Sequence, residues 1–376
     1  MNTHHKPSRA HAAIARVVAV AIITGTLGAL TTVLASEPPG PAATATTYQD
    51  CPVADCSAYP QPSQVRGLTI ATLENWVLYT RSAEAQIRAA RAWHVNTVRL
   101  QIVQDKMVGA AGKSYSQRYA NTVRAIVHYA LGHGLFVVLN AQTEISLHWI
   151  DNENLPTAVT YAFWRHMTAL YGHNPRVIFD LFNEPRYCNW PQWQAAFQPL
   201  VSHVRAEGSR NQFWVEGINW GSTLDGLPLL HGQGIVYSFH HPGSPWPCTP
   251  HACGAPQRLP VSVATWDSAF GDLAAQGVPV VDGEFVNFMG GYYWPRSTQM
   301  VTRYFQYLSY HHVGVVAWSL QPGIMTATNQ ETTAVSEPQG AGRLFWRYFW
   351  GRLAMPAGVH AVAETGGRAR QGSPSR

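Results

Sequence analysis

RVIFDLFNEP, at residues 176–185, is a short apolar run that ends in a polar Asn–Glu pair and a proline. Side chains alternate between the two faces of a strand, so we expect Asp180, Phe182 and Glu184 to share one face. Proline cannot donate to a strand ladder, and the strand is therefore predicted to stop at Glu184. In a parallel α/β sheet or barrel, the carboxyl-terminal strand ends are where the chemistry takes place.

A second stretch, VPVVDGEF at residues 278–285, has the same form and ends in Glu284. Two glutamates at two strand ends predict paired-carboxylate chemistry, and glycoside hydrolysis is its commonest use. Asp180 and Asp282 share the predicted strand faces with these glutamates but lie a pleat deeper. We interpret them as hydrogen-bonding partners in the interior of a barrel.

The chain alternates between strand-like and helix-like segments from residue 66 onward. Roughly eight such units predict the α/β class and a (β/α)8 TIM barrel. A doubly wound open sheet is the alternative, but the chain lacks the glycine-rich phosphate turn that normally follows an early strand of that fold. The predicted strands cover residues 66–70, 95–102, 135–139, 176–184, 212–218, 234–239, 278–284 and 313–317. The predicted helices cover residues 82–93, 115–133, 157–171, 190–207, 263–276, 296–311 and 344–350.

The 376 residues divide into four predicted segments. Residues 1–35 combine a basic start, an apolar run and a small-residue cleavage sequence, which predicts a signal peptide. The apolar run is also close to the length of a bilayer span, so an uncleaved membrane anchor is the alternative. In both cases the body of the protein is expected outside the cytoplasm. Residues 36–62 are predicted to be a Pro/Thr-rich spacer with a disulfide loop, 63–354 the catalytic domain and 355–376 a disordered tail.

Five cysteines agree with export. Cys51 and Cys56 have the same spacing as Cys248 and Cys253, and two local disulfides are predicted in an oxidising compartment. A zinc site is the alternative, but the gap between the cysteines is longer than is usual for zinc ligands. Cys188 is left over, just after the Asn–Glu–Pro stretch.

The formal charge of +5 arises from the two ends of the chain, because six of the 26 basic residues lie there and the body is close to neutral. A nucleic-acid-binding protein would need a basic patch on the fold itself, and none is visible in the sequence. The 14 tryptophans and 16 tyrosines are mostly expected in the core. The remainder are suited to stacking against sugar rings.

With these residues placed, the sequence resembles glycoside hydrolase family 5, the cellulase-like retaining β-glycosidases of the (β/α)8 clan. The resemblance covers most of residues 66–350. Asn–Glu–Pro alone recurs by chance, but six matches occur in the right order on successive predicted strand ends. They are NTVR ending at Arg99, FNEP with Asn183 and Glu184, Trp220, YSFH ending at His240, GEF with Glu284, and Trp318.

The resemblance implies that Glu184 is the general acid/base and Glu284 the nucleophile. Asn183 would then hydrogen-bond the sugar 2-hydroxyl, and Arg99 would hold the Glu284 carboxylate. A neighbouring arginine lowers the pKa of a carboxyl group. We therefore expect Glu284 to be ionised and Glu184 to carry the proton that two close carboxylates share.

The resemblance also implies that His240 lines the site near the glutamates, that Trp318 is a sugar platform and that Trp220 contacts the substrate. The chain departs from the family pattern in two places. It has LNAQ at residues 139–142, where a histidine is common, and His-His-Pro at residues 240–242, where the family has a tyrosine that contacts the nucleophile. These differences leave the subfamily and the substrate open.

No metal and no cofactor are expected. His240 and His241 could suggest a metal site, but no third ligand has a suitable spacing in the sequence. Glu216, which precedes a glycine, is interpreted as a structural residue.

The sequence therefore predicts a secreted or cell-surface, monomeric, retaining endo-β-1,4-glucanase. Its partner would be a β-linked polysaccharide or oligosaccharide, with no nucleic acid partner and no membrane contact beyond the N-terminal segment. The alternatives are a β-mannanase or an exo-β-1,3-glucanase and, in a different class, a catalytically weak carbohydrate-binding barrel.

Overall fold

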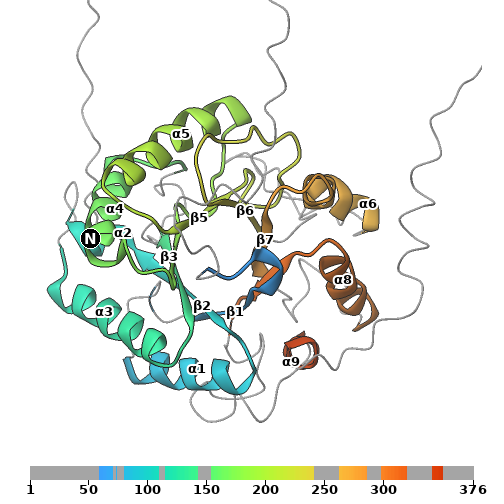
Figure 1. Cartoon of the computed structure of the whole chain (residues 1–376), viewed down its shortest axis with the longest axis horizontal. Coiled ribbons are helices and arrows are strands. Elements are labelled where there is room, and N and C mark those ends of the chain that lie inside the picture. Colours follow the sequence, from blue (N-terminus) through green and yellow to red (C-terminus); the bar gives the residue numbers. More distant parts are fainter. Residues whose placement is uncertain are drawn as a thin grey trace, which may run out of the picture. The chain divides into compact units, whose positions relative to one another are not determined.

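The computed structural model describes residues 59–70, 73, 80–109, 115–142, 154–240, 262–285, 298–319 and 341–349. Within these ranges, eight parallel strands pair in chain order, and β8 pairs with β1 to close a barrel. The described helices surround the strands (Figure 1). The (β/α)8 prediction is confirmed.

The strands alternate with helices along the described chain. The strands are β1 (Arg66–Ile70), β2 (Thr97–Val103), β3 (Phe136–Gln142), β4 (Val177–Asp180), β5 (Gln212–Glu216), β6 (Ile235–His240), β7 (Val280–Phe285) and β8 (Gly314–Ala317). The α-helices are α1 (Thr80–Ala92), α2 (Gln104–Val108), α3 (Gln117–Gly132), α4 (Ala158–Tyr171), α5 (Trp190–Ala206), α6 (Val263–Trp266), α7 (Asp272–Ala275), α8 (Thr298–Tyr310) and α9 (Ala341–Phe349). A short 3-10 helix, η2 (Pro62–Gln64), precedes β1, and a π-helical turn, η3 (Asp267–Gly271), joins α6 to α7.

Local sequence explains where the helix after β4 begins. Asn189 caps α5 by accepting from the N–H of Gln192, and the Gln192 side chain accepts from the N–H of Asn189 in return. Such a reciprocal pair satisfies two N–H groups that a helix start leaves without intrahelical partners. The loop that carries Glu184 is therefore held between a buried strand and a firmly capped helix.

The barrel interior changes from apolar to polar along the strands. One buried cluster takes its residues from the strands and from the position just before β1, and it is apolar throughout. It consists of Val65, Val138, Ile178, Trp214, Val236, Val281 and Val316. Side chains two positions further along a strand point to the same face. That rule places Asn140, Asp180 and Glu216 in the next layer toward the carboxyl ends.

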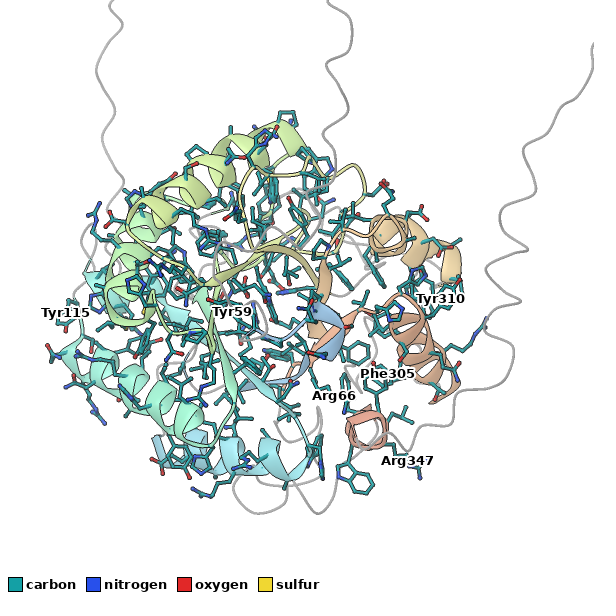
Figure 2. All side chains as sticks on the ribbon, in the orientation of Figure 1. Tyr59, Arg66, Tyr115, Phe305, Tyr310 and Arg347 are labelled. Carbon is teal, nitrogen blue, oxygen red and sulfur yellow. The ribbon has the colours of Figure 1, made fainter. Side chains whose placement is uncertain are left out.

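A larger apolar cluster fills the space between the strands and the helices. Phe305 of α8 belongs to it (Figure 2). Its ring packs on Phe345 and Tyr348 of α9 with ring centres 4.7 and 4.8 Å apart. The outer helices are thereby packed against the sheet, so the strand ends that they connect are held in fixed positions.

β4 is shorter than predicted. It ends at Asp180, and the chain continues as a loop in which Glu184 has a left-handed φ of 51°. Phe182 does not share the face of Asp180: its ring packs edge-on against Phe197 of α5, whereas Asp180 bonds Arg99 inside the barrel. The predicted single strand face through Glu184 was therefore wrong, because the chain leaves the regular strand four residues earlier.

β7 also departs from strict alternation. Its pairing with β6 slips so that Phe239 pairs with Asp282 but His240 pairs with Glu284. Asp282 points outward to α8, where its carboxylate accepts a 2.6 Å hydrogen bond from the Tyr304 hydroxyl. The interior position predicted for Asp282 was wrong, whereas the one predicted for Asp180 is confirmed.

Several sequence-based predictions fall outside the described residues. They concern the N-terminal segment 1–35, most of the spacer 36–62, the cysteine pairs Cys51/Cys56 and Cys248/Cys253, His241 and the tail. Cys188 is described, half-buried and not in a disulfide. None of the described helices is both long and apolar enough to cross a bilayer.

Candidate active site

Arg99 on β2 is the centre of the polar layer at the carboxyl ends of the strands. Its buried guanidinium donates from Nε to Asp180 at 2.9 Å, from Nη1 to Glu284 at 2.7 Å, and from Nη2 to Asn183 at 2.7 Å and Glu216 at 3.0 Å. Burial would lower the pKa of Arg99, but the three carboxylates outweigh it and raise that pKa above its usual value. One permanent cation thus joins groups from β4, β5 and β7.

Glu284 lies in β7 with only 7% of its side chain exposed. The oxygen that Arg99 contacts, Oε2, also accepts a long hydrogen bond of 3.4 Å from Gln101 Nε2. We expected Arg99 to lower the pKa of Glu284. Burial is the larger effect and raises that pKa to about 7, although His240 and Arg99 both pull it down.

Glu184 is held mainly through its main chain, and its carboxylate has one long contact with His240. Its N–H donates to Glu216 Oε2 at 2.6 Å. Its carboxylate is 19% exposed, and Oε1 lies 3.3 Å from His240 Nδ1. The acid/base candidate therefore reaches solvent more easily than Glu284 does.

His240, at the end of β6, is fully buried between three carboxylates. Nδ1 lies 3.3 Å from Glu184 Oε1 and 3.8 Å from Glu284 Oε2, and Nε2 lies 3.3 Å from Glu216 Oε1. Burial would lower the pKa of His240, but Glu216, Glu284 and Glu184 outweigh it and hold that pKa well above its usual value. His240 is thus the second cation of the site.

Two glycines leave room for this imidazole. A Cβ on Gly283 would lie 2.1 Å from Ser238 Oγ and 3.2 Å from His240 Nε2. A Cβ on Gly221, which has a left-handed φ of 69°, would lie 3.2 Å from His240 Cβ. Both positions need glycine because β7 and the loop after β5 approach the histidine so closely.

Glu216 and Gln101 are site residues that the sequence reasoning missed. Glu216 was interpreted as structural, yet it contacts Arg99, His240 and the main chain of Glu184. Gln101 links Glu284 to the Trp318 indole, whose Nε1 donates to Gln101 Oε1 at 3.1 Å. The two-residue alternation of strand side chains could have revealed both residues. Gln101 follows Arg99 by two positions, and Glu216 follows the inward Trp214 by two positions, so each shares the face of its predecessor.

The two tryptophans predicted to contact sugar each contact a neighbour of a different glutamate. Trp318 is half-buried at the end of β8, next to Gln101 and hence to Glu284. Trp220 follows β5, and its main-chain N–H donates to the carbonyl of Pro185, the residue after Glu184, at 3.0 Å. The Arg186 guanidinium lies 4.4 Å from the Trp220 ring centre, so one face of that ring is covered.

The fold also assembles a cluster that the sequence spacing did not reveal. Glu184, His240 and Glu284 each contribute one possible ligand atom. These three atoms lie within 4.8 Å of one another, a spacing that a metal ion could bridge. The argument from sequence that His240 lacks further ligands is therefore wrong. However, Arg99 already neutralises Glu284 at 2.7 Å, and a protonated His240 has no lone pair to offer a metal.

Comparison with protein families and curated proteins places the chain among cellulases. The model of the cellulase family, glycosyl hydrolase family 5, matches residues 56–323. A manganese-dependent endoglucanase of Phanerodontia chrysosporium is 28% identical over 139 residues, which are 36% of this chain and 35% of that protein. Endoglucanase A of Paenibacillus barcinonensis is 24% identical over 251 residues, 53% of this chain and 62% of that protein. The chain thus spans about one third to three fifths of the length of these curated relatives.

Solved structures share the fold. A family 5 cellulase from an Icelandic hot spring isolate superposes with a TM-score of 0.57 at 16% identity, covering 77% of this chain and 88% of the other. The cellulose synthase subunit Z of Clostridioides difficile gives the same TM-score and identity, covering 76% of this chain and 99% of the other. At such identities the likeness establishes the barrel alone.

Proposed function

The chain belongs to the cellulase family, glycosyl hydrolase family 5, and we propose that it is a retaining endo-β-1,4-glucanase. The observation that carries the proposal is the pair of carboxylates. Oxygens of Glu184 and Glu284 lie within 4.8 Å of each other. Retaining glycosidases have carboxyl groups about 5–5.5 Å apart, whereas inverting enzymes separate them by about 6.5–9.5 Å to admit a water molecule.

In the first step, a Glu284 oxygen attacks the anomeric carbon and the glycosidic C–O bond breaks. Glu184 gives its proton to the departing oxygen, so the products are a covalent glycosyl ester on Glu284 and a free sugar hydroxyl. In the second step, Glu184 removes a proton from water, which attacks the same carbon and releases Glu284. Two displacements at one carbon restore the β-configuration.

The surroundings of the two glutamates support this division of roles. Arg99 contacts Glu284 at 2.7 Å and favours its ionised form, which the attack requires. Glu184 is the more exposed group, as proton exchange with water requires. The Asn183 oxygen accepts from Arg99, which orients the amide so that its nitrogen can donate to a sugar hydroxyl.

β-1,4-glucan is the proposed substrate because the relatives named above are endoglucanases. Trp318 beside the nucleophile offers an aromatic ring that suits the apolar face of a sugar. The protein is further proposed to act outside the cytoplasm, because residues 1–35 read as an export segment.

The test is sugar release from a panel of soluble polysaccharides: carboxymethyl-cellulose, mixed-linkage β-glucan, β-1,3-glucan, mannan and xylan. The chain from residue 36 onward is compared with its Glu284→Ala variant. We expect hydrolysis of carboxymethyl-cellulose and mixed-linkage glucan by the unchanged protein alone, with the β-anomer formed first in proton NMR. Hydrolysis of mannan or β-1,3-glucan instead would reassign the substrate.

Binding without turnover by a folded protein would favour a carbohydrate-binding barrel over an enzyme. Release of the α-anomer first would exclude the retaining mechanism.

A further inference from the structure

Glu216 contacts both the main chain and the side-chain partner of Glu184. It lies at the end of β5 and is fully buried. Oε2 accepts from the Glu184 N–H at 2.6 Å, while Oε1 lies 3.0 Å from Arg99 Nη2 and 3.3 Å from His240 Nε2. Among the residues that the structure describes, no other carboxylate makes this double contact.

The 2.6 Å bond falls at an unusual point of the backbone. Glu184 has a φ of 51°, in the left-handed region that residues other than glycine seldom adopt. Hydrogen bonds to a charged acceptor are shorter and stronger than neutral ones. Fixing this N–H fixes the direction in which the Cα–Cβ bond leaves the chain, and therefore the place of the Glu184 carboxylate.

We propose that Glu216 is a positioning residue for the acid/base: it anchors the main chain of Glu184 and holds the His240 imidazole against the Glu184 carboxylate. The proposal rests on the proposed glycosidase function and adds a third glutamate to it. His240 stays protonated beside Glu216, so its Nδ1–H stabilises the carboxylate that Glu184 becomes after giving up its proton.

The charges around Glu216 support an ionised carboxylate at this place. Burial alone would raise the pKa of Glu216, but His240, Arg99 and the Glu184 N–H outweigh it and lower that pKa. The titratable and charged groups that influence Glu216 and His240 come from five elements. They are Arg99 on β2, Asp180 on β4 with Glu184 after it, Glu216 on β5, His240 on β6, and Asp282 and Glu284 on β7.

Glu216→Gln tests the proposal with almost no change in shape. The two oxygens of Glu216 face donors only: the Glu184 N–H on one side, and Arg99 and His240 on the other. A glutamine has one accepting and one donating end, so either orientation sets an N–H against another N–H. We expect kcat on cello-oligosaccharides to fall about 10²-fold, the cost of a misplaced catalytic group, with little change in KM.

The dependence on leaving group distinguishes positioning of the acid from general damage. 2,4-Dinitrophenyl β-cellobioside has a leaving group that needs no proton, and its kcat/KM reports only formation of the glycosyl ester. That kcat/KM should therefore fall far less in Glu216→Gln than kcat/KM for cello-oligosaccharides does. Asp180→Asn is the matched control: it also removes a buried carboxylate from Arg99, but it makes no hydrogen bond to Glu184. Arg99 hydrogen-bonds both Asp180 and Glu284, so this variant should disturb the nucleophile. It should therefore lose activity by the same factor on both substrates.

An equal loss on both substrates by Glu216→Gln, or no loss at all, would overturn the proposal. If that variant does not fold, Glu216→Asp replaces it: the charge remains, but the carboxylate is one methylene shorter and cannot span both sets of donors. The same selective loss is expected, at smaller size.

Nitrogen NMR of labelled histidine gives a readout that does not need turnover. At neutral pH we expect both His240 nitrogens to be protonated in the unchanged protein, and we expect the ring of Glu216→Gln to lose its proton at a lower pH. Unchanged His240 resonances would overturn the proposal. If the protein without any substitution hydrolyses neither glycoside, the proposed function is contradicted instead. The His240 resonances of Glu216→Gln would then be the only test of the positioning role of Glu216.

Discussion

Glu184 and Glu284 end two stretches of sequence that look alike, yet the structure holds them in opposite ways. Glu284 remains within β7, is 7% exposed and is fixed through its carboxylate by Arg99 at 2.7 Å. Glu184 lies beyond the end of β4, is 19% exposed and is fixed through its N–H by Glu216. The end of β7 therefore keeps a buried carboxylate in a fixed position, whereas the loop after β4 presents a carboxyl group to solvent.

The difference matches what the two proposed roles demand. A nucleophile gains from desolvation and from a fixed position, because attack requires close approach along one direction. An acid/base must exchange its proton with a leaving group and then with water. The aspartates that precede the two glutamates differ as well: Asp180 points into the barrel and Asp282 points out to α8.

The largest effect is expected from Glu284→Ala. Loss of a covalent nucleophile in a hydrolase lowers kcat by roughly 10⁵- to 10⁶-fold, and here the loss should not depend on the leaving group. Added azide should restore slow release of α-glycosyl azide, because the anion fits where the carboxylate was and attacks once. Rates on aryl cellobiosides and product NMR measure this. A variant that keeps substantial activity without azide would exclude Glu284 as the nucleophile.

Glu184→Ala should differ from Glu284→Ala, because its loss of activity should depend on the leaving group. Turnover of cello-oligosaccharides should fall about 10²- to 10⁴-fold, the usual contribution of a general acid, whereas formation of the glycosyl ester from 2,4-dinitrophenyl cellobioside should be nearly unchanged. Azide should now give the β-glycosyl azide. Stopped-flow release of dinitrophenol provides the measurement, and an equal loss on both substrates would contradict the acid assignment.

The pH dependence of kcat/KM sharpens the comparison without a mutation. Because burial raises the pKa of Glu284 to about 7 and the attack needs its ionised form, activity should rise with pH through about 7. Below that value, kcat/KM should fall about tenfold per pH unit. Initial rates on aryl cellobioside between pH 4 and 9 test this. An acid limb near the ordinary value of 4.5 would mean that Arg99 and His240 outweigh burial.

Asp282→Asn tests the outward aspartate through stability. Burial raises the pKa of Asp282 from 3.8 to about 7, so the folded protein binds a proton that the unfolded chain has lost between those values. Stability from this group is present below pH 4 and is lost as pH rises through 7. The gap corresponds to about 4 kcal/mol, so the variant should be more stable than the unchanged protein at pH 8 and equal to it near pH 4. Urea unfolding of both proteins at pH 4 and pH 8 measures the difference in stability. A variant that is less stable than the unchanged protein at pH 8 would contradict the prediction.

The smallest effect is expected from removal of metal ions. Arg99 and His240 supply the positive charge between Glu184 and Glu284, so dialysis against EDTA should leave kcat unchanged. Added Mn²⁺ is the control, since one relative is a manganese-dependent endoglucanase. A loss with EDTA that Mn²⁺ restores would show that the cluster of Glu184, His240 and Glu284 binds a cation.

The fold and the two glutamates could be predicted because their signals are local. Strand and helix periods, Gly stops after helices and the Asn–Glu–Pro turn are written within ten or twenty residues. The resemblance to the family then implied the roles of Arg99, Asn183 and His240. The order of these motifs along the chain was enough for the barrel and for the family.

The contacts between the motifs were decided by the tertiary structure alone. Arg99 bonds Glu284 across 185 positions of sequence, and Glu216 bonds Glu184 across 32. The bulge that places Asp282 and Glu284 on different faces of β7 and the loop that carries Glu184 beyond β4 depend on neighbouring strands and helices. Burial, which raises the pKa of Glu284 despite its arginine, is likewise a property of the closed barrel: a sequence fixes which groups can ionise, but only packing removes the water around them.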